Sequence, residues 1–392
     1  MSNSSKRSLD SSRIVLHEEA LKQNIAFLKS HLRKGVSMSS VIKGNAYGHG
    51  ISTFIPMAER AGINHFSVFS AREAEGVLKF RQNPDTGVMI MGMIRNEELE
   101  WAISEGVEIY IFETDRLEAA CSAAQTIGRK ARIHVQIETG MNRTGFEEQH
   151  WDEVFQYIKE QDSDLELMGV CTHFAGAESV ANYFRIQNQN RQFEKALAAA
   201  EQRLGYRPMA HASSSAACLT YPEFQYDMVR IGIAQYGFWP SRETYMHLAK
   251  SSGFMRDNDP LKRVLTWKSE VMSTKWVEEG EFIGYGNVYL AGRKMRIATV
   301  PIGYTHGFAR NLTNTGYVLI NGERAGVVGL VNMNMITVDV TDISGAEKGS
   351  EVVLIGRQGD DEITVASFGE MTNNLNYEIL VRLPASIPRE KE

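Results

Sequence analysis

The segment VSMSSVIKGNAYGHG, residues 36–50, passes from a short apolar run into a lysine and then into a glycine-rich turn. A β-branched, apolar run of this length, followed by turn residues, predicts a buried β-strand. Lys43 stands at the inner end of that strand, where a charge without a partner is costly. The position of this lysine therefore raises a question about function as well as about fold.

Further segments of the same kind recur through the first 240 residues. They are HFSVFS from residue 65, GVMIMG from 87, VEIYIF from 107, ARIHVQIE from 131, LMGVCTHF from 167, PMAHAS from 208 and MVRIGIAQYG from 228. Helical spacing occurs between them, as in Leu21, Ile25, Leu28 and Leu32. Eight alternations of strand and helix predict an N-terminal (β/α)₈ barrel of the TIM type, with a doubly wound sheet as the alternative.

The sequence changes character after about residue 262. Residues 240–262 are polar and include Pro240 and Pro260, which is typical of a linker. Beyond them, strand-like segments follow one another with little helical period, and Asn321-Gly322 has the composition of a hairpin turn. We therefore expect a disordered tail at 1–12, a barrel at 13–245 and a mostly β C-terminal domain at 262–392.

Charge and composition exclude several classes of partner. The formal net charge is −6 and long Lys/Arg clusters are absent, which argues against nucleic acid or an anionic membrane as the main partner. No apolar run is long enough to span a membrane and the first residues lack a secretion signal, so a cytoplasmic location is expected. The spacing of cysteines and histidines matches no zinc motif, and we expect no metal.

Polar residues stand at the ends of the predicted strands, where barrel enzymes carry their chemistry. Any one of them alone is more often a surface lysine, a core histidine or a loop serine. Together they predict a cationic site at the mouth of the barrel. The residues are Lys43 after the first strand, Arg143 after the fifth, His173 at the sixth, Ser213 to Ser215 after the seventh, and Arg230 and Gly232 on the eighth.

These residue types suggest a particular cofactor. A lysine shielded from water has a lowered pKa and offers the free amine that a Schiff base requires. Arginines, a serine-rich loop and a glycine that permits close approach suit a phosphate ester. A lysine combined with a phosphate site suggests pyridoxal phosphate, although aldolases on the same barrel also combine the two.

The sequence resembles the alanine racemase family over nearly the whole chain after the tail. The motifs that carry the resemblance follow the family's order: VIKGNAYGHG, ETGMNRTGF, THFA, HASSSAA, MVRIGIAQYG, IGYGNVY, VPIGYTHG, VNMNM and NYE. The resemblance implies a barrel that binds pyridoxal phosphate and a C-terminal β domain. It also implies the conversion of L-alanine to D-alanine, a cell-wall precursor.

The resemblance implies roles for named residues around the cofactor. Lys43 bonds covalently to it, Arg230 faces the pyridine nitrogen with His211 behind, and His173 lies beside the ring. A permanently charged arginine keeps the ring nitrogen unprotonated, which weakens the electron sink and suppresses side reactions. The phosphate is held by Tyr47, Ser215, Tyr377 and the backbone of Gly232 and Ile233.

Racemisation requires proton transfer on both faces of the α-carbon. By the resemblance Lys43 serves one face and Tyr285 the other, and Tyr285 needs positive charge nearby, from His173 or Arg230, to act as a base. In the family the β domain of one subunit covers the barrel of another, which implies a head-to-tail homodimer with shared active sites. Substrate contacts are implied for Arg143, the backbone of Met333, and Asn334, and Tyr304 and Tyr377 are implied to form a narrow entrance that favours small side chains.

Several positions depart from the family pattern. Gln136 replaces a lysine that many members carry as a carbamate, and we hypothesise that Gln136 or an anion such as chloride supports Arg143. Asn334 replaces a common aspartate, and Thr305-His306 replaces Ala-Asp, which reduces negative charge at the entrance. A broad-specificity racemase for serine, lysine or arginine is therefore the close alternative.

Two other classes remain as alternatives. A pyridoxal-phosphate amino-acid decarboxylase would be expected to carry an acidic residue at the position of Arg230. A non-catalytic protein that binds pyridoxal phosphate would be expected to consist of a barrel alone.

Overall fold

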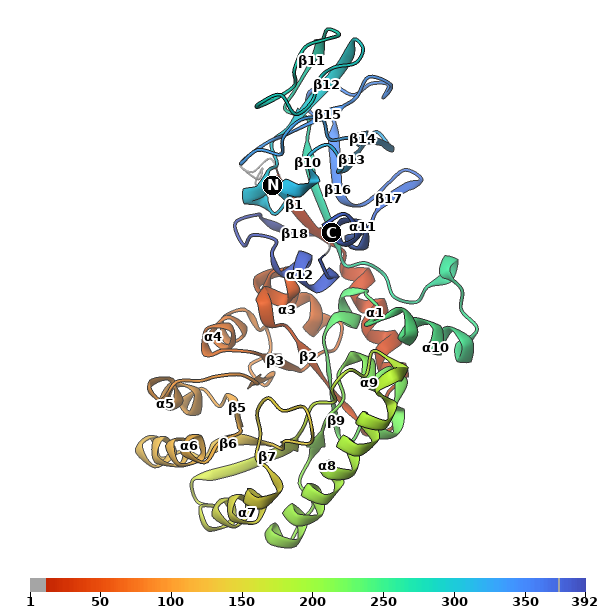
Figure 1. Ribbon diagram of the computed structural model, residues 1–392. Coiled ribbons are helices and arrows are strands. Elements are labelled where there is room, and N and C mark those ends of the chain that lie inside the picture. Colours follow the sequence, from red (N-terminus) through yellow and green to blue (C-terminus); the bar gives the residue numbers. More distant parts are fainter. Residues whose placement is uncertain (1–11, 373) are drawn as a thin grey trace, which may run out of the picture. The chain divides into compact units, whose positions relative to one another are not determined.

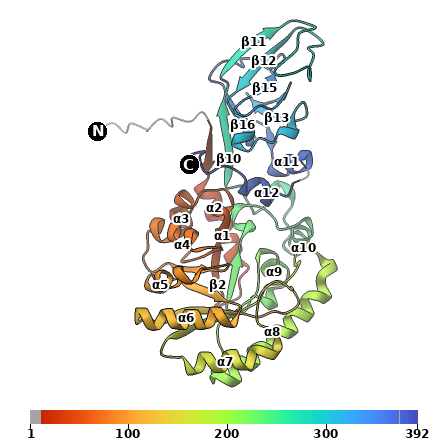
Figure 2. The same cartoon turned by 60° about the vertical axis from the view of Figure 1, so that its left-hand side comes forward.

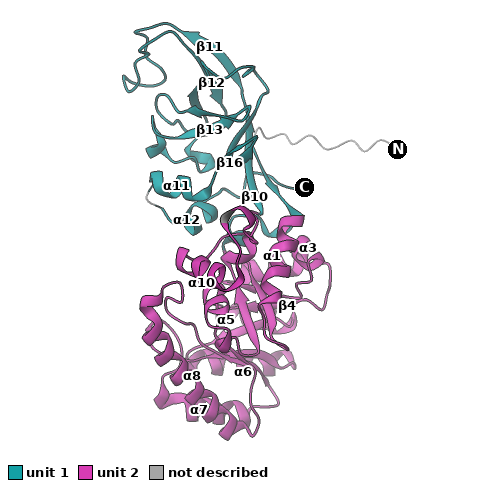
Figure 3. Cartoon of the chain, turned by 90° about the vertical axis from the view of Figure 1, so that its right-hand side faces the viewer, with its two compact units in different colours: residues 1–18, 44–53, 264–392 teal, residues 19–43, 54–263 magenta. Residues whose placement is uncertain are grey.

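The computed structural model describes residues 12–372 and 374–392, and the chain divides into two units (Figure 3). Unit 1 comprises residues 1–18, 44–53 and 264–392, and unit 2 comprises residues 19–43 and 54–263. Two short segments ahead of the expected boundary therefore group with the C-terminal part of the chain.

The expected tail at 1–12 lies outside the described residues except for Ser12. Ser12 is buried, and its hydroxyl accepts a hydrogen bond from Nε1 of Trp267 at 2.9 Å. Ser12 is therefore part of the packed structure of unit 1.

Within the described residues, unit 2 contains a sheet of eight parallel strands (Figures 1 and 2). The hydrogen-bonded order is β8-β7-β6-β5-β4-β3-β2-β9. Backbone N–H groups of Asp227 and Arg230 donate to Ala210 O (3.0 Å) and Ser213 O (2.9 Å), which joins the two edges of the sheet. The predicted barrel is confirmed. Its strands are β2 (Ser37–Val41), β3 (His65–Val68), β4 (Gly87–Ile90), β5 (Glu108–Ile111), β6 (Ala131–Gln136), β7 (Leu165–Cys171), β8 (Ala210–His211) and β9 (Met228–Ile231).

Helices alternate with the barrel strands, as the spacing of apolar residues predicts. Helix α7 shows the principle, because Trp151, Val154, Phe155 and Ile158 lie along one buried face. Ser70 caps α4 by accepting the backbone N–H of Glu73. The helices are α1 (Glu18–Ser30), α3 (Ile51–Arg60), α4 (Ala71–Phe80), α5 (Asn96–Ser104), α6 (Thr114–Ile127), α7 (Trp151–Glu160), α8 (Tyr183–Leu204), α9 (Ser215–Thr220) and α10 (Arg242–Ser252).

The prediction of a linker over residues 240–262 is wrong, because this segment contains helix α10. Ser241 caps the helix by accepting the N–H of Thr244 at 3.0 Å, and Gly253 ends it with φ of +73°. Thr244 and Leu248 are buried four residues apart on one face. The segment is therefore helical although its overall composition is polar, because Ser241 and Gly253 cap it and Thr244 and Leu248 pack it against the protein.

The described part of unit 1 contains a seven-stranded sheet and a three-stranded sheet. The larger has the order β14-β13-β16-β10-β1-β18, with β17 paired to β16, and the smaller has the order β11-β12-β15. The predicted mostly β domain is confirmed, although it also contains helices α11 (Val365–Thr372) and α12 (Asn376–Val381). The strands are β1 (Arg13–Leu16), β10 (Leu265–Glu270), β11 (Ser273–Val277), β12 (Met295–Val300), β13 (Tyr317–Ile320), β14 (Glu323–Gly326), β15 (Ile336–Asp339), β16 (Glu351–Gln358), β17 (Asp361–Ile363) and β18 (Arg389–Lys391).

The predicted hairpin turn at Asn321-Gly322 is confirmed. It joins β13 to β14, whose residues Ile320 and Glu323 pair directly. Asn321 and Gly322 have φ of +51° and +84°, the left-handed pair that a two-residue hairpin needs.

Replacing Gly237 by alanine is expected to destabilise the barrel strongly. Gly237 has φ of +91°, and an added Cβ would lie 1.9 Å from the carbonyl oxygen of Lys262. The left-handed backbone alone costs about 1–2 kcal/mol, and displacing a backbone carbonyl raises the expected loss of unfolding free energy to about 3 kcal/mol or more. Chemical denaturation measures this loss.

The matched control is Gly253→Ala. Gly253 has a similar φ of +73°, but nothing lies within 4 Å of an added Cβ. This variant should show only the backbone cost of about 1–2 kcal/mol. Equal losses for the two variants would mean that the close approach at Gly237 is unimportant.

Candidate active site

Lys43 follows strand β2 directly after Ile42, whose backbone N–H donates to Ser67 O at 2.9 Å. Its side chain keeps contact with solvent, yet the surrounding protein displaces part of its hydration. This desolvation, together with the positive charges of Arg143 and Arg230, lowers the pKa of the amine against the opposing effect of Glu73. Lys43 is thus accessible to a ligand and more readily deprotonated than an ordinary lysine.

The chain turns after Lys43 through a short left-handed helix, α2 (Lys43–Tyr47). Gly44, Asn45 and Ala46 have φ of +64°, +55° and +55° and ψ of +44° to +50°. Such a conformation costs roughly 1–2 kcal/mol for each residue other than glycine. Hydrogen bonds offset the cost: Gly48 N–H donates to Gly44 O at 3.0 Å, and Asn45 Oδ1 accepts the N–H of Ile51 at 3.0 Å.

Arg230 on β9 is buried and anchored through both terminal nitrogens. Nη1 donates to His211 Nδ1 at 2.6 Å and to His211 O at 3.0 Å. Nη2 donates to Thr172 O at 2.8 Å and makes longer contacts with Ala212 O and His173 Nδ1. Among the described residues, no group accepts a hydrogen bond from Nε. The guanidinium is therefore fixed and retains one N–H for a ligand.

The histidines beside Arg230 are neutral at ordinary pH. Burial, and then the charge of Arg230, lower the pKa of His173 to about 3 and that of His211 well below its usual value. The expectation that His173 supplies positive charge to a tyrosine base is therefore wrong. Arg230 is the permanent cation of this cluster.

Ser215 and Gly232 come together after strands β8 and β9. Ser215 begins α9 and is buried, and its Oγ accepts the backbone N–H of Gly232 at 2.9 Å. Ile233 begins the 3₁₀ turn Ile233–Tyr236 directly after Gly232. Because the Ser215 oxygen accepts this bond, its hydroxyl hydrogen remains for a phosphate oxygen beside the backbone N–H of Ile233.

Arg143 lies in a loop that the carboxylate of Glu138 organises. Glu138 accepts the backbone N–H groups of Met141 (2.7 Å) and Arg143 (3.2 Å). Sequence reasoning missed this role, although an acidic residue before a glycine-rich turn is a recognisable signal. Gln136 accepts a hydrogen bond from Thr144 Oγ1 at 3.2 Å, so it acts on the neighbour of Arg143 and, among the described residues, does not bond the guanidinium itself.

Tyr47 and Tyr377 lie beside each other in unit 1. Tyr47 is buried, which raises its pKa to about 12, and its ring centroid lies 6.1 Å from that of Tyr377 on α12. The Tyr47 hydroxyl therefore remains protonated and able to donate at neutral pH.

Tyr285 projects from the loop between β11 and β12 of unit 1. It stands between Gly284 and Gly286, which have φ of +78° and +65°, and it is 72% exposed. The base of the loop is held by the backbone hydrogen bond from Ile283 N–H to Tyr289 O at 3.0 Å. An aromatic side chain presented in this way is available to a partner molecule.

Three further predicted residues meet at a second loop of unit 1. Thr305 Oγ1 donates to Met333 O at 2.7 Å, and Asn334 Nδ2 donates to Thr305 Oγ1 at 3.1 Å. Tyr304 N–H donates to Asn332 O at 3.0 Å, which holds Tyr304 next to this pair. The substitutions noted at Thr305 and Asn334 therefore form one neutral hydrogen-bonded unit.

Fold and site together define a parallel-barrel protein that carries an accessible lysine and a buried, anchored arginine at its strand ends. A family model described as "Alanine racemase, N-terminal domain" matches residues 16–240, and "Alanine racemase, C-terminal domain" matches residues 264–391. The chain belongs to the alanine racemase family.

Individual relatives agree with this assignment. An alanine racemase of Leptospira interrogans is 34% identical over 99% of this chain and 97% of its own, and one of Symbiobacterium thermophilum is 35% identical over 94% of each. The crystal structure of alanine racemase from Streptomyces lavendulae has a TM-score of 0.87 at 27% identity and covers 98% of both chains. The Bartonella henselae enzyme, solved with covalently bound pyridoxal phosphate, shares the fold with a TM-score of 0.82 at 24% identity over 98% of this chain and all of its own.

Two other features are absent from the described residues. No helix there combines the length and apolar character that a membrane span requires. No group of three or more histidine, cysteine, aspartate or glutamate side chains there could hold a metal ion.

Proposed function

We propose that this protein interconverts L-alanine and D-alanine with pyridoxal phosphate. The proposal rests on two side chains that occur together in one barrel. Lys43 has a lowered pKa, and Arg230 has one N–H left for a ligand. The lysine provides an amine that can bond to the cofactor, and the arginine provides a fixed donor for its ring.

The residues of the chain fit this cofactor. Pyridoxal phosphate, when bound, supplies an electron sink that stabilises negative charge on the α-carbon of an amino acid. Lys43 would hold its aldehyde carbon, Arg230 Nε its ring nitrogen, and His173 one side of its ring. Its phosphate would be held by Ser215, Tyr47, Tyr377 and the backbone of Gly232 and Ile233.

Arg230 also favours racemisation over decarboxylation. A guanidinium does not give up its proton near neutral pH, so it can donate a hydrogen bond to the ring nitrogen without protonating it. An acidic residue would be expected there in a decarboxylase. We infer that Arg230 limits how strongly charge is drawn into the ring and so keeps the reaction to proton exchange.

Two groups would move the proton. We propose that Lys43 serves one face of the α-carbon once the substrate amine has displaced it, and that Tyr285 serves the other. The lowered pKa of Lys43 and the exposure of Tyr285 support these roles. We propose further that Tyr285 acts on the site of a second subunit in a head-to-tail homodimer.

Substrate binding follows from the same assignment. Arg143 and the backbone N–H of Met333 would hold the substrate carboxylate, and Tyr304 and Tyr377 would restrict the entrance to small side chains. The neutral pair formed by Thr305 and Asn334 favours a second candidate, a racemase of broader specificity. We propose a cytoplasmic enzyme that supplies D-alanine for cell-wall synthesis.

The proposed activity is tested by incubating the purified protein with pyridoxal phosphate and L-alanine in deuterated water. We expect deuterium at the α-carbon and loss of optical rotation, because a proton removed on one face is replaced from solvent on the other. Release of carbon dioxide would support a decarboxylase, and no reaction would support a binding protein. Parallel reactions with serine, lysine and arginine decide between narrow and broad specificity.

A further inference from the structure

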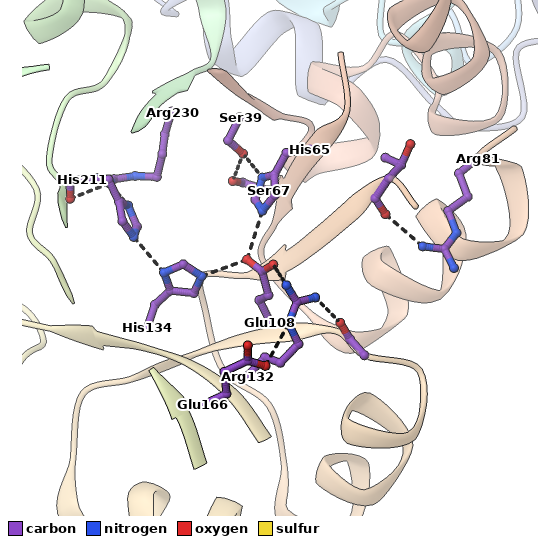
Figure 4. A network of polar contacts seen from close by, with 12 residues as sticks. Ser39, His65, Ser67, Arg81, Glu108, Arg132, His134, Glu166, His211 and Arg230 are labelled. Carbon is purple, nitrogen blue, oxygen red and sulfur yellow. Dashed lines mark hydrogen bonds and ion pairs between the residues drawn. The ribbon is translucent and has the colours of Figure 1, made fainter. Parts of the chain in front are cut away.

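Glu108 is a buried carboxylate at the start of β5, inside the barrel of unit 2 (Figure 4). Its Oε2 lies 2.8 Å from His134 Nε2 and 3.0 Å from His65 Nε2. Its Oε1 pairs with Arg132 Nη2 at 3.0 Å. A carboxylate that is 4% exposed is tolerated only with such partners, so all of these groups are expected to be ordered.

A chain of hydrogen bonds continues from Glu108 to Arg230. His134 Nδ1 lies 2.9 Å from His211 Nε2, and His211 Nδ1 lies 2.6 Å from Arg230 Nη1. His134 and His211 are fully buried. Figure 4 shows these four side chains in succession. Glu108 begins β5, whereas His211 ends β8, so the hydrogen bonds run from the N-terminal end of the barrel to the C-terminal end.

The two end groups of this hydrogen-bond chain, Glu108 and Arg230, fix the positions of the imidazole protons between them. Arginine can only donate, so Nδ1 of His211 must accept and its proton lies on Nε2. His134 Nδ1 must then accept from His211, which places the proton of His134 on Nε2, facing Glu108. An ionised carboxylate only accepts, so the last bond is also satisfied.

The charge states agree with this arrangement. Burial alone would raise the pKa of Glu108, but hydrogen bonds from His134 and His65 hold it well below its usual value. Burial lowers the pKa of His134 and of His211, so each carries a single proton at ordinary pH. The chain therefore consists of one carboxylate, two neutral imidazoles and one guanidinium.

We propose that Glu108 is a positioning residue for Arg230, acting through His134 and His211. By holding the proton of each imidazole on Nε2, it keeps an acceptor facing Arg230 Nη1 and so fixes the guanidinium in the orientation that leaves Nε free. The inference rests on the proposed function in one respect, namely that Nε then donates to the ring of pyridoxal phosphate.

Glu108→Gln tests the direction of the chain. Arg132 only donates, so it holds the amide oxygen toward itself and turns the amide N–H₂ toward His134. His134 must then accept on Nε2, which moves its proton to Nδ1 and forces the same change on His211. Two donors would face each other between His211 and Arg230, and Arg230 would lose its shortest hydrogen bond.

His65→Gln is the matched control. His65 contacts the same carboxylate oxygen as His134, but it does not lie on the path to Arg230. Its replacement by another donor disturbs the same buried cluster and leaves the chain to Arg230 intact. Glu108→Asp retains an acceptor-only group and should recover the properties of the unchanged protein better than Glu108→Gln.

Neutron diffraction from the cofactor-free, unchanged protein tests the chain without any variant. We expect deuterium on Nε2 and none on Nδ1 of both His134 and His211. Deuterium on Nδ1 of either residue would overturn the inference. This measurement does not depend on whether the protein binds pyridoxal phosphate or racemises any substrate.

Titration with pyridoxal phosphate tests the consequence for the site. In Glu108→Gln we expect a shifted absorption maximum of the bound cofactor and about tenfold weaker binding, as for the loss of one charge-assisted hydrogen bond. His65→Gln should leave both unchanged. Equal effects in the two variants, or none in Glu108→Gln, would overturn the positioning role while the proposed function stands. Failure of the unchanged protein to bind the cofactor would remove the proposed function, and the neutron result would still decide whether Glu108 positions Arg230.

Discussion

Replacing Lys43 by alanine is expected to reduce kcat/KM for alanine racemisation by about 10⁴-fold or more, because the proposed function makes Lys43 both the cofactor attachment and one of the two proton carriers. Lys43→Arg keeps the positive charge but lacks a removable proton near neutral pH, so it should be equally inactive. Steady-state rates with both enantiomers measure the effect.

Borohydride reduction of the cofactor-loaded protein provides the decisive control. In the unchanged protein the reduced cofactor should be found on Lys43 by peptide mapping, and the attachment should begin at lower pH than for an ordinary lysine because the pKa of Lys43 is lowered. Lys250 on α10 is exposed, and Lys250→Ala should change nothing. Label on another lysine, or activity in Lys43→Ala, would contradict the assignment.

Tyr285→Phe is expected to reduce racemisation by about 10²–10⁴-fold, the usual contribution of a single acid-base group. The loss in kcat/KM must be the same in both directions, because the two enantiomers have equal free energy in water. Exchange of the α-hydrogen with solvent separates the two bases. It should persist for the enantiomer whose proton faces Lys43 and disappear for the other.

Tyr289→Phe is the matched control for Tyr285. Both tyrosines belong to the same loop, but Tyr289 packs against the cluster that contains Ile283 and Val328. The control should retain racemisation and exchange with both enantiomers. Exchange that survives for both enantiomers in Tyr285→Phe would remove Tyr285 from the proposed mechanism.

Much of the fold follows from local sequence patterns. Each barrel strand is a short apolar run, and Asn321-Gly322 predicts its turn, because burial and left-handed geometry act within a few neighbouring residues. Helix α10 was not predicted, because residues 240–262 are polar on average. The helix packs through only two buried side chains, Thr244 and Leu248. Strand β1 carries no local sign that it pairs with β10, some 250 residues away along the sequence.

The candidate site was predictable where it depends on strand ends and not where it depends on register. Lys43, His173 and Arg230 stand at or near the ends of apolar runs, so their convergence follows from parallel strands. The prediction that His173 carries a positive charge is wrong, because burial and the charge of Arg230 lower its pKa far below the ordinary value. The hydrogen-bond chain from Glu108 through His134 could not be predicted. It depends on which side chains of neighbouring strands lie at the same level of the barrel, and the sequence does not give this register.

The pairing of β1 with β10 and β18 has a consequence for how the protein is made. Strand β10 is synthesised directly after the last segment of the barrel at residue 263, whereas β18, the other partner of β1, follows all the other strands. Domains generally fold as their residues emerge, so the barrel can assemble while the ribosome still carries the remainder. Until β18 has been made, one edge of β1 lacks the hydrogen-bonding neighbour that it has in the folded protein, and an unpaired strand edge can pair with another chain.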